Sequence, residues 1–223
     1  MNEDILKEID NICNRYKIDI KISYSENKEE FIREFSDKIL WYNISHFQEL
    51  SEEFIREFFE KIDWNEVSYC QKLSEEFIRE FSNKLDWITL SYAQELSEEF
   101  IREFSEKLDW TYLSRYQKFS EKFISEFSEK VDWIEISIYQ NLSEGFIRKF
   151  SKKLDWNYIS ASQELSEEFI CEFEDKISFL YLPFNKNLTE NIIRKYISKL
   201  DINHLLKNNS LPQNIKEILK IYQ

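Results

Sequence analysis

The sequence predicts an all-α fold, an α-solenoid of short antiparallel helix pairs built from a 23-residue helix-turn-helix repeat. The sequence motif of residues 96–110, LSEEFIREFSEKLDW, recurs along the chain with small changes at a constant spacing of 23 residues. Each copy contains two helix N-cap signals. One Gly and two Pro in 223 residues depart from an average globular composition, which indicates an unusual organisation.

The repeat stays in register from residue 28 to residue 211, which corresponds to eight units. Residues 1–27 are predicted to form an N-terminal capping helix and linker, because Ile5, Leu6 and Ile9 share one helical face. Residues 212–223 are predicted to form a C-terminal capping helix, with Pro212 in its first turn. Caps with a polar outer face keep a solenoid from growing end to end.

The first helix of each copy begins with a Ser. In the copy over residues 50–72, Ser51 is a candidate N-cap, and Glu52 and Glu53 place negative charge where the helix dipole favours it. We expect this helix to continue to about Lys61.

The second helix of each copy begins with an Asp. Asp63 is expected to cap a helix from Trp64 to about Gln71, with Glu66 completing a capping-box-like pair. Isolated helices of this length are marginal in water. Repetition of the sequence therefore supplies the neighbour that each helix pair needs.

One arc of the first helix is predicted to form the core, because Phe54, Ile55, Phe58 and Ile62 lie together at about 100° per residue. The residues predicted to form the repeat core are Trp41, Trp64, Trp87, Trp110, Trp133 and Trp156 with Phe58, Phe81, Phe104, Phe127 and Phe150.

The opposite side of the first helix is charged. Glu52 with Arg56, and Glu57 with Lys61, have the favourable i,i+4 order. We expect a solvated surface whose charges pair within each helix.

One arc of the second helix is constant, with Trp, an aliphatic residue, Ser and Gln in successive copies. Ser68 is small enough to let helices approach, and Gln71 can bond a backbone group left over at a helix end. We interpret these residues and their equivalents as structural rather than catalytic.

The other arc of the second helix differs between copies. Variation on one face of a constant scaffold is typical of a partner-specific surface, and Tyr and Arg are enriched at binding hot spots. A competing interpretation is that this arc packs against adjacent units and has drifted after duplication. The candidate partner-binding residues are Tyr42, His46, Phe47, Tyr69, Tyr92, Tyr112, Arg115, Tyr116, Ile138, Tyr139 and Tyr158.

No catalytic site, metal site or cofactor is expected. His46 and His204 are far apart and lack an i,i+4 His or Cys companion, so both are expected at the surface. The only Gly is Gly145, inside the first turn of a helix, which disfavours a phosphate-binding loop. Carboxylates recur identically in every unit, whereas catalysis needs a unique pair in a pocket.

The net charge of −13 opposes a phosphate backbone, so nucleic acid is not an expected partner. Three separated Cys residues without a CxxC motif indicate reduced thiols. The acidic N-terminus lacks a secretory apolar segment, and no apolar run is long enough to span a membrane. We therefore expect a cytoplasmic protein without a membrane partner.

Two further functions are open. The repeated acidic faces of the first helices permit self-association or a structural role in assembly. An acidic decoy for a nucleic-acid-binding protein would use the net charge of −13.

Two stretches of the sequence resemble tandem repeats in uncharacterised proteins of large DNA viruses that infect amoebae. They are LSEEFIREFSNKLDW at 73–87 and SYAQELSEEFIREF at 91–104. The resemblance covers residues 28–177 closely and 178–211 loosely, where Ser178, Pro183 and Lys186 replace the usual Asp, Ser and Gln. It implies a protein made in infected cytoplasm that acts on host proteins, and it brings no known site. The three replacements predict a bent or shortened helix.

Overall fold

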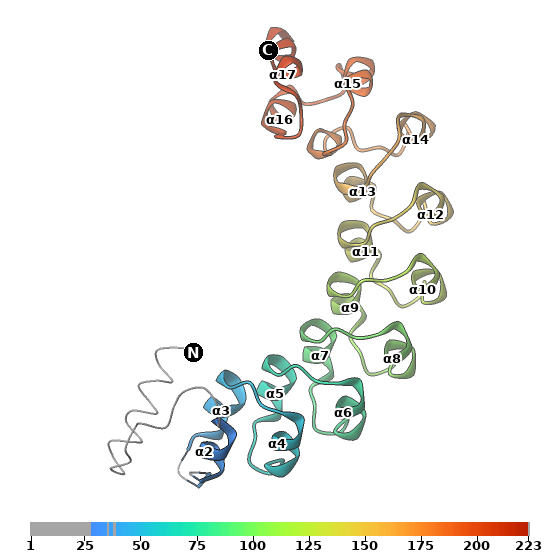
Figure 1. Ribbon diagram of the computed structural model, residues 1–223. Helices are drawn as coiled ribbons and strands as arrows, with labels where there is room; N and C mark the ends of the chain where they lie inside the picture. Colours follow the sequence, from blue (N-terminus) through green and yellow to red (C-terminus); the bar gives the residue numbers. More distant parts are fainter. Residues whose placement is uncertain (1–27, 35, 38, 223) are drawn as a thin grey trace. The chain divides into compact units, whose positions relative to one another are not determined.

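The computed structural model describes residues 28–34, 36–37 and 39–222, so the N-terminal cap predicted over residues 1–27 lies outside the described residues. Every regular element among the described residues is helical, which confirms the predicted α-solenoid of helix pairs (Figure 1). The chain divides into two compact units, of which the first ends at Asp109 and the second begins at Trp110.

Within each unit the first helices of the copies lie in one layer and the second helices in another (Figure 1). The helices of the first unit are α2 (Lys28–Glu34), α3 (Trp41–Phe47), α4 (Glu52–Glu57), α5 (Trp64–Cys70), α6 (Glu75–Glu80), α7 (Trp87–Ala93) and α8 (Glu98–Glu103). The helices of the second unit are α9 (Trp110–Tyr116), α10 (Glu121–Glu126), α11 (Trp133–Tyr139), α12 (Glu144–Lys149), α13 (Trp156–Ser162), α14 (Glu167–Glu172), η1 (Leu182–Phe184), α15 (Glu190–Tyr196), α16 (Ile202–Lys207), α17 (Gln213–Leu219) and η2 (Lys220–Tyr222).

The predicted N-caps are present. The Ser51 hydroxyl accepts a hydrogen bond from the Phe54 amide at 3.2 Å, and the Asp63 carboxylate accepts from the first-turn amides of α5. The amide of Asp63 itself donates to the Ser45 hydroxyl of the preceding copy at 3.0 Å. The prediction that Glu66 completes a capping-box-like pair with Asp63 is therefore wrong, because the Asp63 amide is already bonded to Ser45 of the preceding copy.

The first helix is shorter than predicted, because α4 ends at Glu57 rather than near Lys61. Phe58 leaves the helical region at φ −110° and ψ 27°. The amide of Lys61 closes a turn onto the Phe58 carbonyl at 2.8 Å, and the indole N–H of Trp64 donates to the Phe59 carbonyl at 3.0 Å. A side chain thus satisfies a carbonyl that a continuing helix would have used.

The fully buried core consists of aromatic and aliphatic side chains from both layers. Phe54 and Ile55 of α4 and Val67 of α5 are each 0% exposed. Each such side chain contributes about 1.5–3 kcal/mol when it leaves water. Because these residues recur in every copy, the core of each unit is continuous from one copy to the next.

The Trp residues and the Phe residues that end the first helices are only half-buried and pack onto this core. The Trp41 ring lies 4.9 Å from the Phe58 ring of the next copy, and its indole N–H donates to the Ser36 carbonyl at 2.9 Å. The Lys61 ammonium lies 5.9 Å from the same indole ring. The Trp side chains therefore join successive copies, as predicted, but at the margin of the core.

The constant Gln residues bridge successive copies through buried hydrogen bonds. The Gln71 side-chain amide donates to the carbonyls of Ser45 and Gln48 at 2.8 and 2.7 Å. Its oxygen accepts from the Leu50 amide at 2.9 Å. One side chain thus satisfies three backbone groups between α3 and α4, which confirms the predicted bond to backbone groups at a helix end.

The constant Ser residues complete this arrangement. The Ser68 hydroxyl donates to the Trp64 carbonyl at 2.7 Å and accepts from the Asp86 amide of the next copy at 3.0 Å. We call the constant Ser and Gln side chains the hydrogen-bond ladder; in the first unit they are Ser45, Gln48, Ser68, Gln71, Ser91 and Gln94, and in the second Ser114, Gln117, Ser137, Gln140, Ser160 and Gln163.

Charges on the first helices pair both within a helix and between successive copies. The Glu52–Arg56 pair is present at 3.6 Å. The predicted Glu57–Lys61 pair is wrong, because Lys61 binds Asp37 of the preceding copy at 2.6 Å. The shorter Arg–Glu pairs, at 2.7 or 2.8 Å, join neighbouring copies: Arg33–Glu57, Arg56–Glu80, Arg79–Glu103 and Arg148–Glu172.

The copy that begins with α14 departs from the others in its second half, as its sequence predicts. Its second helix is reduced to the 3-10 helix η1, which contains Pro183. The side-chain amide of Asn185 donates to the carbonyls of Ser160 and Gln163 at 2.9 Å each. Asn185, rather than Lys186 at the aligned position, therefore takes the place of the ladder Gln.

The last helix, α17, begins directly after Pro212, which occupies its N-cap position. Ile215 and Leu219 are its buried residues, and α17 packs against α16. The chain then continues into the short helix η2.

Candidate functional site

The side chains that differ between copies lie on the arc of the second helices opposite the hydrogen-bond ladder. Three of the predicted site residues, His46, Tyr92 and Ile138, are partly buried. The exposed ones are Tyr42, Phe47, Tyr69, Tyr112, Arg115, Tyr116, Tyr139 and Tyr158. We call these eleven residues the variable face.

In the first unit the variable face is a group of aromatic rings on α3, α5 and α7. The Phe47 ring meets the His46 ring edge-on at 4.2 Å, and Tyr42 stacks on His46 at 5.9 Å. The rings of Tyr69 and Tyr92, from successive copies, are 6.1 Å apart. These contacts fix the rings relative to the scaffold while leaving Tyr42 and Tyr69 more than half exposed.

In the second unit the variable face carries a cation among its rings. The Arg115 guanidinium lies 5.4 Å from the Tyr116 ring centroid and 5.0 Å from that of Tyr139 on the next second helix. The rings of Tyr112 and Tyr116 are 6.3 Å apart on α9. Cation–π contacts of this kind hold an exposed guanidinium in place without removing its hydrogen-bond donors from solvent.

Two exposed residues lie on the predicted variable arc but were not among the candidate partner-binding residues. Ile88 and Ile134 follow the Trp of their helices and are each 52% exposed. Other copies carry the polar residues Asn65 and Asn157 at this position. An aliphatic residue at a position that is polar in other copies was the signal that could have identified them.

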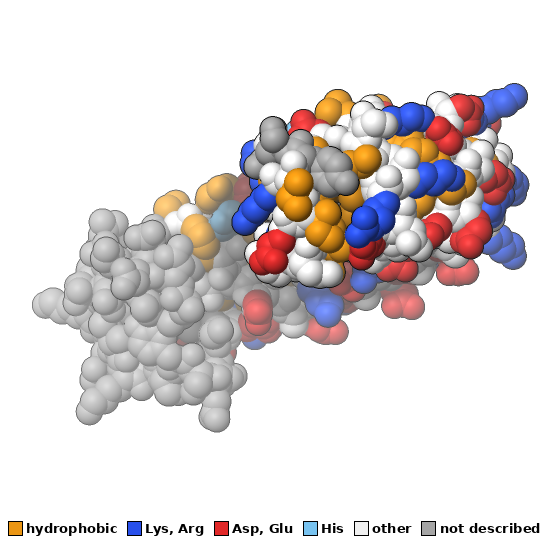
Figure 2. Space-filling model, turned by 90° about the horizontal axis from the view of Figure 1, so that it is seen from above, with side chains coloured by type: hydrophobic (Ala, Val, Ile, Leu, Met, Phe, Trp, Pro, Cys, Tyr) orange, Lys and Arg blue, Asp and Glu red, His pale blue; other side chains and the backbone are white. Residues whose placement is uncertain are grey.

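The layer of first helices carries charges that pair between copies, as with Arg148 and Glu172 at 2.8 Å. Figure 2 views the protein from above, where acidic and basic side chains are intermingled with exposed hydrophobic side chains on the surface nearest the viewer. The hydrogen bond from Arg148 lowers the pKa of the Glu172 carboxyl.

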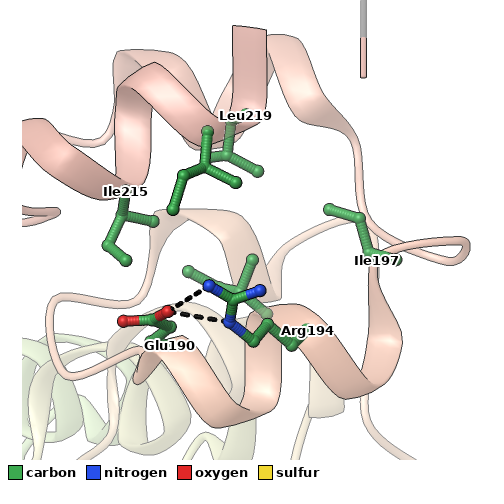
Figure 3. Close-up of a pocket in the computed structure, with 7 residues that line it drawn as sticks. Glu190, Arg194, Ile197, Ile215 and Leu219 are labelled. Carbon is green, nitrogen blue, oxygen red and sulfur yellow. Dashed lines mark hydrogen bonds and ion pairs between the residues drawn. The ribbon is translucent and has the colours of Figure 1, made fainter. Parts of the chain in front are cut away.

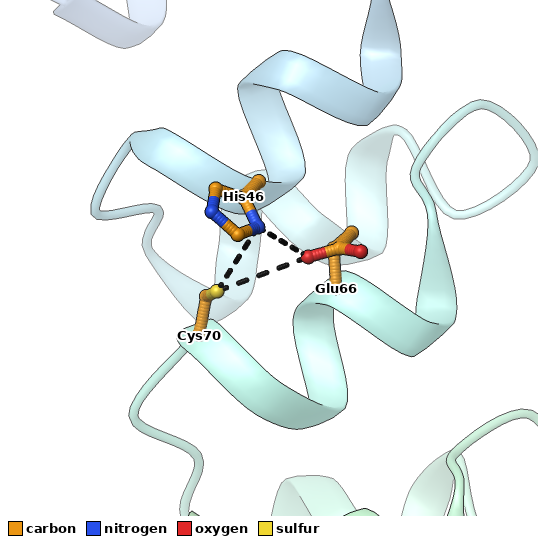
Figure 4. A group of neighbouring side chains, drawn as sticks. All are labelled: His46, Glu66 and Cys70. Carbon is orange, nitrogen blue, oxygen red and sulfur yellow. Dashed lines mark hydrogen bonds and ion pairs between the residues drawn. The ribbon is translucent and has the colours of Figure 1, made fainter.

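The structure also brings together three metal-ligating groups that the sequence prediction kept apart. His46 of α3 lies beside Glu66 and Cys70 of α5, with the three ligand atoms within 4.8 Å of one another (Figure 4). The His46 Nδ1 atom is 2.5 Å from Glu66 Oε2 and 3.5 Å from Cys70 Sγ. The sequence pattern did not reveal this group because its histidine belongs to the preceding copy, on a different helix from Glu66 and Cys70.

His204, the other histidine, lies near the C-terminal end of the chain. Its ring is 4.9 Å from the Phe184 ring, and its Nδ1 atom is 3.6 Å from the Asp201 carboxylate. Asp201 caps the same helix through the His204 amide. These contacts give His204 a structural role at the start of α16.

A pocket lies between α15 and α17 (Figure 3). Its two charged residues, Glu190 and Arg194, form an ion pair with each other. The remaining lining is aliphatic: Ile193, Ile197, Ile215, Ile218 and Leu219. Because the charges of the lining are mutually satisfied, we assign this pocket no catalytic role.

Comparisons with protein-family models, with curated proteins and with solved structures give no match to this chain. Among the described residues, no helix combines the length and the apolar character required to cross a lipid bilayer.

Proposed function

We propose that the protein is a non-enzymatic repeat scaffold that binds a protein partner through the variable face. The observation that carries the proposal is the distribution of exposed hydrophobic side chains. Among the described residues, most of the large ones lie on the second helices: Tyr42, Phe47, Tyr69, Ile88, Tyr112, Tyr116, Ile134, Tyr139 and Tyr158. Exposed apolar groups collected on one face of each unit favour a binding surface.

The chemistry of this face suits protein recognition. Tyr buries a large area at little cost in side-chain entropy, and Arg supplies several donors, so both are enriched at binding hot spots. The constant ladder holds each second helix in the same place, so that substitutions on the variable face change the chemistry presented without changing the scaffold. The resemblance to viral tandem repeats favours host proteins as the partners.

The assembly alternative draws less support from the structure. It requires charges on the first helices to engage other chains, yet Arg56, Arg79 and Arg148 already form short pairs with carboxylates of the next copy. Breaking an internal pair to form an external one brings little net gain. The decoy alternative has only the net charge of −13 in its favour.

The test is affinity capture from the native cell with charge-reversed variants of the variable face. The triple variant Tyr112→Glu, Arg115→Glu, Tyr116→Glu alters residues that are exposed, so the helical circular dichroism should be retained. We expect it to lose the proteins that the unsubstituted chain captures, because a buried unpaired carboxylate at an interface is strongly unfavourable.

The matched control is Lys152→Glu, which reverses an exposed charge between α12 and α13. It should capture the same proteins as the unsubstituted chain. Capture that survives the triple variant would contradict the proposal.

A further inference from the structure

The group formed by His46, Glu66 and Cys70 has the composition of a transition-metal site. Glu66 and Cys70 are four residues apart on α5, so they share one face of that helix. The packing of α3 against α5 brings His46 onto the same face (Figure 4). Imidazole, thiolate and carboxylate together suit zinc, whereas magnesium and calcium prefer oxygen ligands alone.

Two of the three distances are close to those around a tetrahedral ion. Ordinary zinc bond lengths place two ligand atoms about 3.5 Å apart when one is sulfur, and about 3.3 Å apart when neither is. The Cys70 Sγ atom is 3.5 Å from His46 Nδ1 and 3.9 Å from Glu66 Oε2. Only the 2.5 Å separation of His46 from Glu66 must widen, and both side chains are partly exposed. A small rotation of either side chain accommodates the ion.

The group also contains an anionic ligand. The Glu66 carboxylate oxygen lies 3.9 Å from Cys70 Sγ and beside the His46 ring. A divalent ion bound among the three side chains would neutralise the charge of this carboxylate.

The group occurs once among the described copies. One copy later the same three positions hold Tyr69, Thr89 and Ala93. In the second unit they hold Arg115, Glu135 and Tyr139, where a permanent cation stands in the place of the histidine. The ligand set is therefore a feature of α3 and α5 and is not required by the repeat.

We propose that His46, Glu66 and Cys70 bind a zinc ion, with one coordination position left for water. Binding releases the thiol proton to solvent and forms one bond each to nitrogen, oxygen and sulfur. The ion ties α3 to α5 at the edge of the variable face, beside Tyr42 and Phe47.

The test is titration of the full-length reduced protein with cobalt(II), which reports zinc sites by absorbance. We expect one cobalt per chain, a thiolate-to-cobalt charge-transfer band and the visible bands of a four-coordinate ion. Added zinc should abolish these bands by displacing cobalt.

Variants drawn from other copies locate the site without disturbing the repeat. Cys70→Ser and His46→Ala introduce the residues that stand at the same positions as Ser162 and Ala161. Cys70→Ser should remove the charge-transfer band, and His46→Ala should weaken cobalt binding by at least about tenfold. Both should keep the circular dichroism of the unsubstituted chain.

The matched controls are Cys171→Ser, which alters an exposed thiol in the second unit, and Cys13→Ser, outside the described residues. Both should retain the full cobalt spectrum. The proposal fails if the unsubstituted chain gives no charge-transfer band, if the band survives Cys70→Ser, or if either control variant loses it.

Discussion

The middle copies and the copy around η1 reach the same connection by different residues. The Gln163 side-chain amide donates to the carbonyls of Ser137 and Gln140 at 3.2 and 2.8 Å. Asn185, with a shorter side chain and a shorter helix before it, donates to Ser160 and Gln163, the equivalent carbonyls one copy later. The fold therefore conserves two hydrogen bonds to the preceding copy, while residue type and helix type vary.

Other features of the repeat are lost at the same place. Phe179 stands in the Trp position and lacks an indole N–H, and Ser178 replaces the Asp cap. Nevertheless the Ser178 amide still donates to the Ser160 hydroxyl at 2.9 Å. The copy that has lost the indole bond and the Asp cap keeps these hydrogen bonds to the preceding copy, so we expect the ladder to contribute more to stability than either.

Removal of a ladder Gln should have the largest effect on stability. Gln140→Leu leaves two buried carbonyls and the Phe119 amide without their partner. Each buried unsatisfied group costs about 1–3 kcal/mol, so we expect a loss of about 3 kcal/mol after partial relaxation. Urea unfolding followed by circular dichroism measures it. Lys118→Leu, at an exposed position, is the control, and equal midpoints for the two variants would disprove the role of the ladder.

Exchange of Gln and Asn at the bridging position should have an intermediate effect on stability. Gln140→Asn keeps the amide group but shortens the side chain without shortening α11, so at least one carbonyl bond is lost, at about 1–2 kcal/mol. Asn185→Gln lengthens a buried side chain and should cost about 1–2 kcal/mol by overpacking. Thermal unfolding of both variants measures these losses. A neutral result for Gln140→Asn would show that the preceding helix length does not select the residue.

Loss of one indole bond should have a smaller effect. Trp133→Phe removes the hydrogen bond to the Ser128 carbonyl at 3.0 Å and retains an aromatic ring against Phe150. We expect a loss of about 1 kcal/mol, because the Ser128 carbonyl keeps its hydrogen bond from the Lys153 ammonium at 3.0 Å. Equilibrium unfolding of this variant, beside Trp133→Leu as the variant without a ring, separates the bond from the ring contact. A larger loss for Trp133→Phe than for Trp133→Leu would contradict this ranking.

The exposed ion pairs should have the smallest effect. Arg148 lowers the pKa of Glu172, mainly by hydrogen bonding, and Lys199 lowers that of Glu174 in the same way. Because these folded-state pKa values lie below the unfolded value of about 4.3, the stabilisation is complete above that pH and disappears as pH falls through the lowered values. Tm should therefore decrease between about pH 5 and 3. The decrease of Tm with falling pH should be smaller in Glu172→Gln, and 1 M salt should make it smaller in the unsubstituted protein. The same decrease of Tm in Glu172→Gln as in the unsubstituted protein would refute the contribution of this ion pair.

The local features of this fold were predictable from sequence, and the contacts between copies were not. The caps Ser51 and Asp63 have strong short-range signals, and the period itself indicated the solenoid. The end of α4 at Glu57 has no Gly or Pro to mark it, because the turn is made by the Trp64 indole bond. The Arg56–Glu80 pair and the contact of His46 with Cys70 each join residues 24 apart in sequence. This offset depends on how successive copies pack against each other, which the sequence pattern does not specify.

The central claim is that each copy is held by buried hydrogen bonds from the next, and amide hydrogen exchange at Leu142 tests it most directly. This amide lies in the loop between α11 and α12 and donates to the Gln163 side chain at 3.0 Å. The account predicts that it exchanges as slowly as the helical Ile136 amide, and that Gln163→Leu accelerates Leu142 at least about 100-fold more than Ile136. Exchange of Leu142 at the rate of an unprotected loop amide in the unsubstituted protein would contradict the account.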